Sequence, residues 1–144
     1  MIREVTNKDL LELKNLYMQL HPDQAINEKM FSVQIDNILK QAHIRMIGLE
    51  IDNKIISTCM VVRIDGLSYN CRPFAIIENL VTDQEHRQNG YAKEVVTRAI
   101  DIAKDWNCYK VILETGTQQK WKWQFYRDCG LNQGEKTSFI KRFS

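Results

Sequence analysis

One stretch of this 144-residue chain decides the fold, namely Val81-Thr82-Asp83-Gln84-Glu85-His86-Arg87-Gln88-Asn89-Gly90-Tyr91-Ala92-Lys93. The apolar run from Phe74 to Val81 predicts a buried strand, and the amphipathic pattern after Gly90 predicts a long helix. The free N–H groups and the positive end of the helix dipole would face the polar turn between them. The stretch therefore predicts an anion-binding site where a strand leads through a turn into a helix.

The composition is that of an ordinary globular protein, most simply a single domain spanning residues 1–144. Hydrophobic residues make up 44% and charged residues 26%, and the formal net charge of +2 demands no polyelectrolyte partner. The 4 cysteines show no CxxC spacing, which favours reduced thiols and no metal site. No apolar run approaches the roughly 18 residues of a membrane span. We expect a cytoplasmic protein with neither a membrane nor a metal partner.

Patterns on both sides of the opening stretch complete an α/β order. Strands are expected near residues 2–5, 44–51, 55–64, 74–82, 109–114 and 138–143. Helices are expected near residues 10–20, 27–39, 91–106 and 120–129, the last closed by Gly130. The order β-α-α-β-β-β-α-β-α-β predicts an α/β fold: a mixed sheet with helices on both faces.

Two motifs within this order resemble the GNAT N-acetyltransferase superfamily. Arg87-Gln88-Asn89-Gly90-Tyr91-Ala92 is similar to the pyrophosphate loop of the family, Gln/Arg-x-x-Gly-x-Gly/Ala, at all the defined positions. Phe125-Tyr126-Arg127-Asp128-Cys129-Gly130-Leu131 resembles its FY-x-x-x-GF segment, with leucine in place of the final phenylalanine. The resemblance covers nearly the whole chain and is strongest from Glu78 to Leu131.

The resemblance implies acetyl-CoA as cosubstrate, bound where the fourth and fifth strands splay apart. The backbone of the fourth strand would hold the pantetheine arm at Leu80, Val81 and Thr82. The pyrophosphate would lie on Arg87, Gln88, Asn89, Gly90, Tyr91, Ala92 and Lys93, with Gln119 replacing an asparagine that contacts pantetheine in many members. The residues fit this role, because Gly90 lets phosphate approach the backbone and Arg87 can add a charge-assisted contact.

Two side chains are candidates for proton transfer. An alkyl ammonium has a pKa near ~10 and must lose a proton before it attacks a thioester. Glu78 interrupts an apolar strand, where partial desolvation would raise the pKa of its carboxyl towards a useful range for a base. The alternative is that Glu78 pairs with a basic neighbour or seats the substrate amine. The resemblance makes Tyr126 the general acid for the departing thiolate, and its alternative is a core aromatic.

The function predicted on these grounds is acetyl transfer from acetyl-CoA to a primary amine of a small molecule or peptide, by direct attack in a ternary complex. The alternative is a catalytically silent CoA-binding sensor or interaction module. The resemblance places the acceptor near residues 17–27 and 65–72, which contain Tyr17, His21, Asp23, Gln24, Tyr69 and Arg72. These side chains fit a small polar amine, an amino sugar, a polyamine or a peptide N-terminus equally well.

Two further segments bear on partners. Lys120-Trp121-Lys122-Trp123 interleaves cations and aromatics, a pattern that can stack on bases. In a nearly neutral protein it favours a half-buried helix with snorkelling lysines, so no nucleic-acid partner is expected. The alternation around Phe139 and Phe143 in the last expected strand permits a homodimer.

Overall fold

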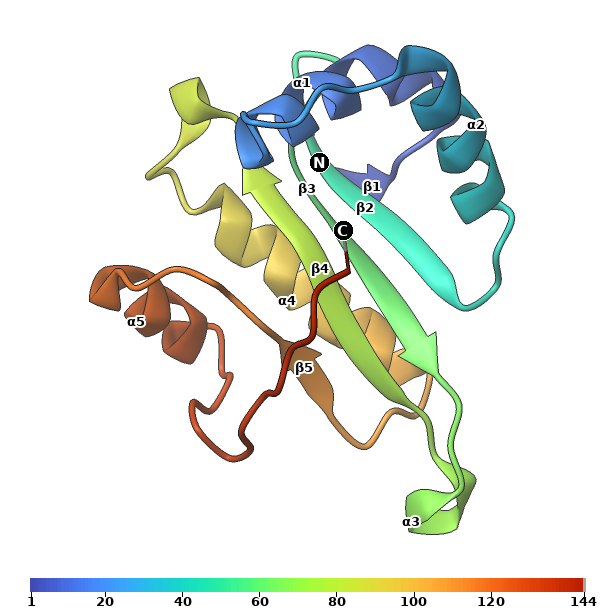
Figure 1. The fold of residues 1–144 in the computed structure, drawn as a ribbon, viewed down its shortest axis with the longest axis vertical. Helices are drawn as coiled ribbons and strands as arrows, with labels where there is room; N and C mark the ends of the chain where they lie inside the picture. The colour runs from blue at the N-terminus through green and yellow to red at the C-terminus, as the bar shows by residue number, and fades with distance from the viewer. Residues whose placement is uncertain (144) are drawn as a thin grey trace. The chain divides into compact units, whose positions relative to one another are not determined.

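A five-stranded sheet organises the chain, of which this computed structural model describes residues 1–143 (Figure 1). The strands are β1 (Ile2–Glu4), β2 (Ile44–Ile51), β3 (Lys54–Ile64), β4 (Phe74–Thr82) and β5 (Val111–Leu113), and they lie in that order across the sheet. The pairs from β1 to β4 are antiparallel, whereas β4 and β5 are parallel. The mixed sheet predicted from the sequence is confirmed.

The helices are α1 (Leu10–Leu20), α2 (Glu28–Leu39), α3 (Ser68–Cys71), α4 (Tyr91–Asp105) and α5 (Lys120–Asp128), with short 3-10 turns η1 (Asn7–Asp9) and η2 (Gln84–His86). A capping box of Thr6 and Asp9 precedes α1. The side chain of Asn27 caps α2 by accepting a hydrogen bond from the backbone N–H of Met30. The chain forms two compact units, the first covering Met1–Glu114 and the second beginning at Thr115.

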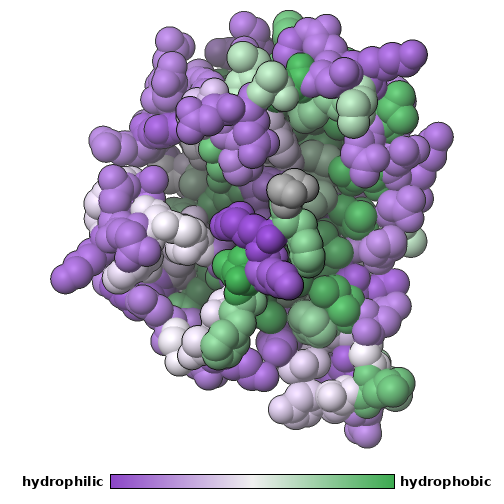
Figure 2. All heavy atoms as spheres, viewed as in Figure 1, coloured by the Kyte–Doolittle hydropathy of each residue, from purple (hydrophilic) through white to green (hydrophobic). Residues whose placement is uncertain are grey.

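Within the first unit, the helices pack on both faces of the sheet. Leu13, Leu16 and Ile35 of α1 and α2 form one buried cluster with Met46 and Ile55 of the sheet. The visible side of α1 and α2 mixes hydrophilic and hydrophobic residues (Figure 2), and Leu11, Met18, Met30 and Val33 of these helices are exposed. Figure 1 shows α4 behind the sheet, and its buried stripe consists of Val95, Val96, Ala99, Ile102 and Ala103. Apolar side chains at helical spacing therefore determine both layers.

Strand β4 contains a bulge. Thr58 of β3 pairs with Val81 and Met60 pairs with Glu78, so Asn79 and Leu80 face a single β3 residue. The backbone of Asn79 lies in the left-handed region, with φ of 57°. Asparagine tolerates that conformation better than the apolar residues of the strand.

The fifth strand is shorter than predicted, since it comprises Val111–Leu113 and not residues 109–114. It pairs with β4 from Ala75 to Ile77. Beyond Ile77, the structure of residues 1–143 gives β4 no strand partner on this side. The expected splaying of these two strands stays a prediction; what the structure shows is that β5 ends early.

The predicted last strand over residues 138–143 is wrong, because the structure assigns no strand there. A β-strand needs a partner for its backbone hydrogen bonds. The described part of the second unit, from residue 115 to 143, contains no strand that could supply one. Phe139 and Phe143 are consequently 91% and 85% exposed.

Among residues 1–143, no helix combines the length and the apolar character needed to cross a membrane. The same residues contain no group of three or more histidine, cysteine and acidic side chains that could hold a metal ion.

Candidate active site

The turn between β4 and α4 has an unusual backbone. Gln88 and Gly90 both lie in the left-handed region, with φ of 64° and 81°. A Cβ atom built on Gly90 would meet nothing within 4 Å. The glycine is therefore explained by the backbone conformation and not by crowding inside the protein. It also leaves space above the start of α4 that a ligand can use.

Helix α4 begins without a side-chain cap, because its N-cap residue is Gly90. The first backbone bond to the N-cap carbonyl runs from Glu94 N–H to Gly90 C=O, at 3.2 Å. The amides of Tyr91, Ala92 and Lys93 precede this bond and have no partner of the helical kind. Uncapped amides and the positive end of a helix dipole form a phosphate-binding arrangement.

Two cations lie beside these amides in the sequence. The Arg87 Nε donates a 3.1 Å hydrogen bond to the carbonyl of Thr82, which holds the guanidinium against the end of β4. Arg87 and Lys93 are both exposed. The amides, the left-handed glycine and the two cations fit the pyrophosphate that the sequence predicts at this turn.

The turn is braced by Gln19 of α1, a residue that the sequence analysis missed. Its side chain donates a 2.8 Å hydrogen bond to the carboxylate of Asp83 and accepts a 2.9 Å bond from the N–H of Gln84. The hydrogen bond from Gln19 and a 2.7 Å contact with His86 hold the pKa of Asp83 below its usual value. Asn89 donates to the carbonyls of His86 and Arg87. The turn is consequently held in one conformation.

The predicted pantetheine contacts lie on the last residues of β4. Val81 is buried, and the Thr82 hydroxyl forms a 2.8 Å hydrogen bond with Ser57. The side chain of Leu80 is half-buried. These side chains belong to the sheet and its core, so what the strand can offer to a ligand is its unpaired edge beyond Ile77.

Glu78 is exposed, so the expectation that its carboxylate is partly desolvated is wrong. β5 stops opposite Ile77, so among the residues described the backbone edge of β4 from Glu78 onward has no strand partner on that side. The role of Glu78 as a base stays a prediction.

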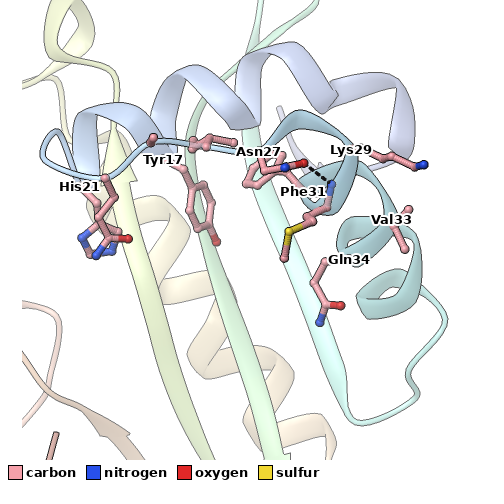
Figure 3. A pocket seen from close by; sticks show the side chains of 11 residues that line it. Tyr17, His21, Asn27, Lys29, Phe31, Val33 and Gln34 are labelled. Atoms are coloured by element: carbon pink, nitrogen blue, oxygen red, sulfur yellow. Dashed lines mark hydrogen bonds between the residues drawn. The ribbon is translucent and has the colours of Figure 1, made fainter. Parts of the chain in front are cut away.

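A cavity of about 780 Å³ lies at the junction of α1 and α2. It is lined by Tyr17, His21, Gln24, Ala25, Ile26, Asn27, Lys29, Met30, Phe31, Val33 and Gln34 (Figure 3). The wall is largely apolar, with several amides and no acidic side chain among these described residues. Its size suits a small-molecule site.

Tyr17 connects this cavity to β4. Its ring meets Phe31 edge-on, at 5.6 Å between centroids, and Figure 3 shows its hydroxyl directed away from α1 towards the sheet. Burial raises the pKa of the Tyr17 hydroxyl, a hydrogen bond with the Asn79 side chain lowers it, and nearby Cys59 and Glu78 raise it again. Burial is the largest of these effects, so the net pKa of the Tyr17 hydroxyl is raised.

Some of the predicted acceptor residues are brought together and others are not. Tyr17, His21 and Gln24 line the cavity, whereas Asp23, Tyr69 and Arg72 are not among its lining residues. The ring of Tyr69 packs at a tilt against that of Tyr109, with 4.5 Å between the ring centroids. Arg72 donates to the carbonyls of Asn107 and Cys108, at 3.1 and 3.0 Å.

The second unit carries the other two predicted site residues. Tyr126 of α5 is half-buried, burial raises the pKa of its hydroxyl, and a hydrogen bond with Thr115 opposes that shift. Gln119 is the N-cap residue of α5 and is exposed, and its side chain makes no cap hydrogen bond. Gly130, with φ of 92°, closes α5 as predicted, through its N–H to the Arg127 carbonyl and the Leu131 N–H to the Tyr126 carbonyl.

The chain is similar to proteins of known family. The acetyltransferase (GNAT) family matches residues 10–131. Glucosamine 6-phosphate N-acetyltransferase from Arabidopsis thaliana is 34% identical over 83 residues, or 58% of this chain and 54% of the relative. The match thus spans about half the length of that curated relative.

Solved structures show the same fold. A protein from Agrobacterium tumefaciens str. C58 assigned as an acetyltransferase is 30% identical, with a TM-score of 0.92 and 99% of each chain covered. The structure of the Arabidopsis glucosamine-6-phosphate N-acetyltransferase is 26% identical, with a TM-score of 0.88, and covers 100% of this chain and 98% of its own. The chain belongs to the acetyltransferase (GNAT) family.

Proposed function

We propose that the protein transfers the acetyl group of acetyl-CoA to a primary amine of a small molecule or peptide, by direct attack in a ternary complex. One observation carries the proposal. In the part of the chain that the structure describes, the edge of β4 facing β5 has no strand partner beyond Ile77, and β4 continues through a braced turn into the uncapped start of α4. An extended amide-containing arm and a pyrophosphate are the two parts of CoA that such a continuous element suits.

The residues proposed to bind acetyl-CoA follow that element in order. The backbone of Leu80, Val81 and Thr82 would pair with the pantetheine arm. The turn and the first residues of α4, from Arg87 to Lys93, would hold the pyrophosphate through amides and two cations. Gln119, whose side chain is not used as a cap, would add an amide contact to pantetheine.

The proposed chemistry moves three protons. Glu78 takes a proton from the acceptor ammonium, and the neutral nitrogen then attacks the thioester carbonyl carbon. As the carbon–sulfur bond breaks, the nitrogen releases its second proton to solvent and becomes the neutral amide. Tyr126 gives its hydroxyl proton to the departing thiolate and regains one from solvent. The exposure of Glu78 supports return of its proton to water. The raised pKa of Tyr126 supports a hydroxyl that stays protonated at neutral pH.

The cavity between α1 and α2 is proposed to receive the acceptor. Its volume suits a small amine, and Tyr17 joins its wall to the strand that carries Glu78. The Arabidopsis relative is named for glucosamine 6-phosphate, which makes an amino sugar phosphate one candidate among small amines.

The test is release of free thiol from acetyl-CoA in the presence of a panel of amines. Acetyl transfer predicts amine-dependent thiol release, together with an acetylated product detected by mass spectrometry. Binding of acetyl-CoA without thiol release across a wide panel would contradict the proposal and favour a catalytically silent CoA-binding module.

We also propose a cytoplasmic homodimer in which residues 1–144 act as one catalytic domain. Phe139, Ile140 and Phe143 are 91%, 68% and 85% exposed, and an exposed apolar cluster favours association. Light scattering coupled to size-exclusion chromatography should give the mass of two chains. The Phe139→Ser/Phe143→Ser variant should shift that mass towards one chain, and a monomeric wild type would contradict the proposal.

A further inference from the structure

The cavity between α1 and α2 has an aromatic floor on the side nearest the core. The rings of Tyr17 and Phe31 line the cavity and meet edge-on, with 5.6 Å between their centroids. Both side chains are half-buried and pack against the core cluster that contains Leu13 and Leu16. Because the core supports them, the two rings form a fixed apolar surface.

The outer part of the cavity wall is apolar as well. Met30 and Val33 of α2 line the cavity, although they are 70% and 53% exposed. Ala25 and Ile26, in the loop before α2, continue the same wall. Removing apolar surface from water is favourable in proportion to its area, on the protein and on the ligand alike. The wall therefore rewards a ligand that covers it with apolar surface of its own.

Fewer polar groups are free to serve a ligand in this cavity. The side-chain oxygen of Asn27 is already used, since it accepts the 3.0 Å hydrogen bond that caps α2. Figure 3 shows the ammonium of Lys29 directed away from Tyr17. The remaining polar side chains of the described wall are His21, Gln24 and Gln34. A few polar groups in a mostly apolar wall are typical of a site that orients a ligand and binds it through its apolar body.

The shape and place of the cavity favour a small molecule as its occupant. Its volume of about 780 Å³ lies in the range of small-molecule sites. Helix α1, which forms one side of the cavity, also packs against β4, the strand that carries Glu78. The cavity consequently suits the body of the amine that is acetylated.

We propose that Met30 and Val33 are specificity-determining residues and that the preferred acceptor is a primary amine attached to an apolar body, an alkyl chain or an aromatic ring. The inference rests on the proposed acetyl transfer and names the substrate class of the same site. The amino sugar phosphate in the name of the Arabidopsis relative belongs to the opposite, strongly hydrophilic class.

The test is a series of straight-chain primary amines, from propylamine to heptylamine, in the thiol-release assay. Chain length changes the apolar surface but hardly changes the pKa of the amine, so the intrinsic reactivity stays constant along the series. The value of kcat/KM should rise about two- to fourfold with each added methylene, with fourfold for complete burial. The ether amine 2-(2-methoxyethoxy)ethylamine has the length of heptylamine and should be the poorer substrate.

A double variant, Met30→Gln/Val33→Thr, tests the two residues directly. It keeps the size of both side chains and removes apolar surface at exposed positions, where substitutions have little effect on stability. The gain per methylene should fall below about 1.5-fold, whereas the KM for acetyl-CoA and the kcat/KM for propylamine should change little. Leu11→Gln is the matched control, because Leu11 is also 70% exposed but is not part of the cavity wall.

The inference would be overturned by a wild type whose kcat/KM does not rise with chain length, or that prefers glucosamine 6-phosphate to heptylamine. An equal gain per methylene in the wild type and the double variant would overturn it too. If the wall is instead an interface between two copies, the double variant should lower the mass in light scattering and leave the gain unchanged, which also contradicts the inference. Absence of thiol release with every amine would contradict the proposed acetyl transfer itself, so the two failures are distinguishable.

Discussion

Two regions of the molecule are built on different principles: the end of β4 together with the start of α4, and the cavity between α1 and α2. The first region is made of backbone: an unpaired strand edge, two left-handed residues and uncapped helix amides. The second is made of side chains, from Tyr17 to Gln34, on two helices. A backbone site depends on few residue types, whereas a side-chain site can change at every position. This difference explains why a sequence indicates the acetyl donor, acetyl-CoA, more readily than the amine that accepts the acetyl group.

Helix α1 links the two regions through residues two positions apart. Gln19 hydrogen-bonds Asp83 and Gln84 of the turn before α4, and Tyr17 contacts Asn79 of β4. The same helix that forms one wall of the cavity therefore also braces the proposed phosphate turn. Displacement of α1 would affect both sites.

The largest effect is expected for Glu78→Gln. Loss of a general base should lower kcat about 1000-fold at neutral pH and leave acetyl-CoA affinity unchanged. The rate of the variant should recover as the pH rises towards the amine pKa of about 10, because the amine then loses its proton without help. Pre-steady-state and steady-state thiol release across pH would measure this.

Glu12→Gln on α1 is the matched control for Glu78→Gln, since it removes the same charge outside the proposed site. If Glu78→Gln had the same kcat as this control at neutral pH, Glu78 would not be the base, and its alternative role of positioning the substrate amine would be favoured.

Tyr126→Phe should lower kcat about 100-fold with little change in the KM for acetyl-CoA. Burial raises the pKa of the Tyr126 hydroxyl above its usual value near 10, so the group stays protonated, and able to donate, throughout the neutral range. The wild-type rate should therefore show no loss from Tyr126 ionisation between pH 7 and about 9. A turnover number equal to that of the wild type would exclude the acid role.

Gly90→Val tests the backbone region. Valine is strained at φ of 81° and would place its side chain in the space above the helix amides. Loss of charge-assisted contacts to phosphate should raise the Kd of CoA about 30-fold, measurable by calorimetry. Gly134→Val places the same strain at φ of 82° in the second unit and serves as the control. Equal CoA affinity in the two variants would exclude the turn as the phosphate site.

Gln19→Ala tests the link between the two regions and should have the smallest effect on CoA affinity. Removal of the 2.8 and 2.9 Å hydrogen bonds loosens the turn, so the Kd of CoA should rise about threefold. The KM for the acceptor amine should stay unchanged, because the ring of Tyr17 in the cavity wall keeps its contact with Phe31. A raised KM for the amine would show that the two regions are not separable.

The sequence predicted the elements that follow strong periodicity or a defined cap. β4 spans Phe74–Thr82 as expected, and Gly130 closes α5. It did not predict the length of β5 or the absence of a strand at residues 138–143. Both depend on available pairing partners, which a local pattern cannot reveal.

The site was predictable where it rests on the backbone. Gly90 and the start of α4 follow from a residue type and its position before an amphipathic helix. Glu78 was expected to be desolvated because its neighbours are apolar, yet it is exposed, since apolar neighbours in the sequence do not determine what covers a side chain in the folded sheet. Gln19 and Asn79 were missed, since a polar residue on an amphipathic helix or in a strand gives no sign of a partner far along the chain.

Titration of isotope-labelled protein with CoA, followed by the backbone amide resonances, tests most directly whether CoA lies along the end of β4 with its phosphates at the start of α4. We expect the largest chemical-shift changes at the amides of Tyr91, Ala92 and Lys93, with further changes from Glu78 to Thr82. Saturable CoA binding that leaves the amides of residues 91–93 unshifted would contradict it.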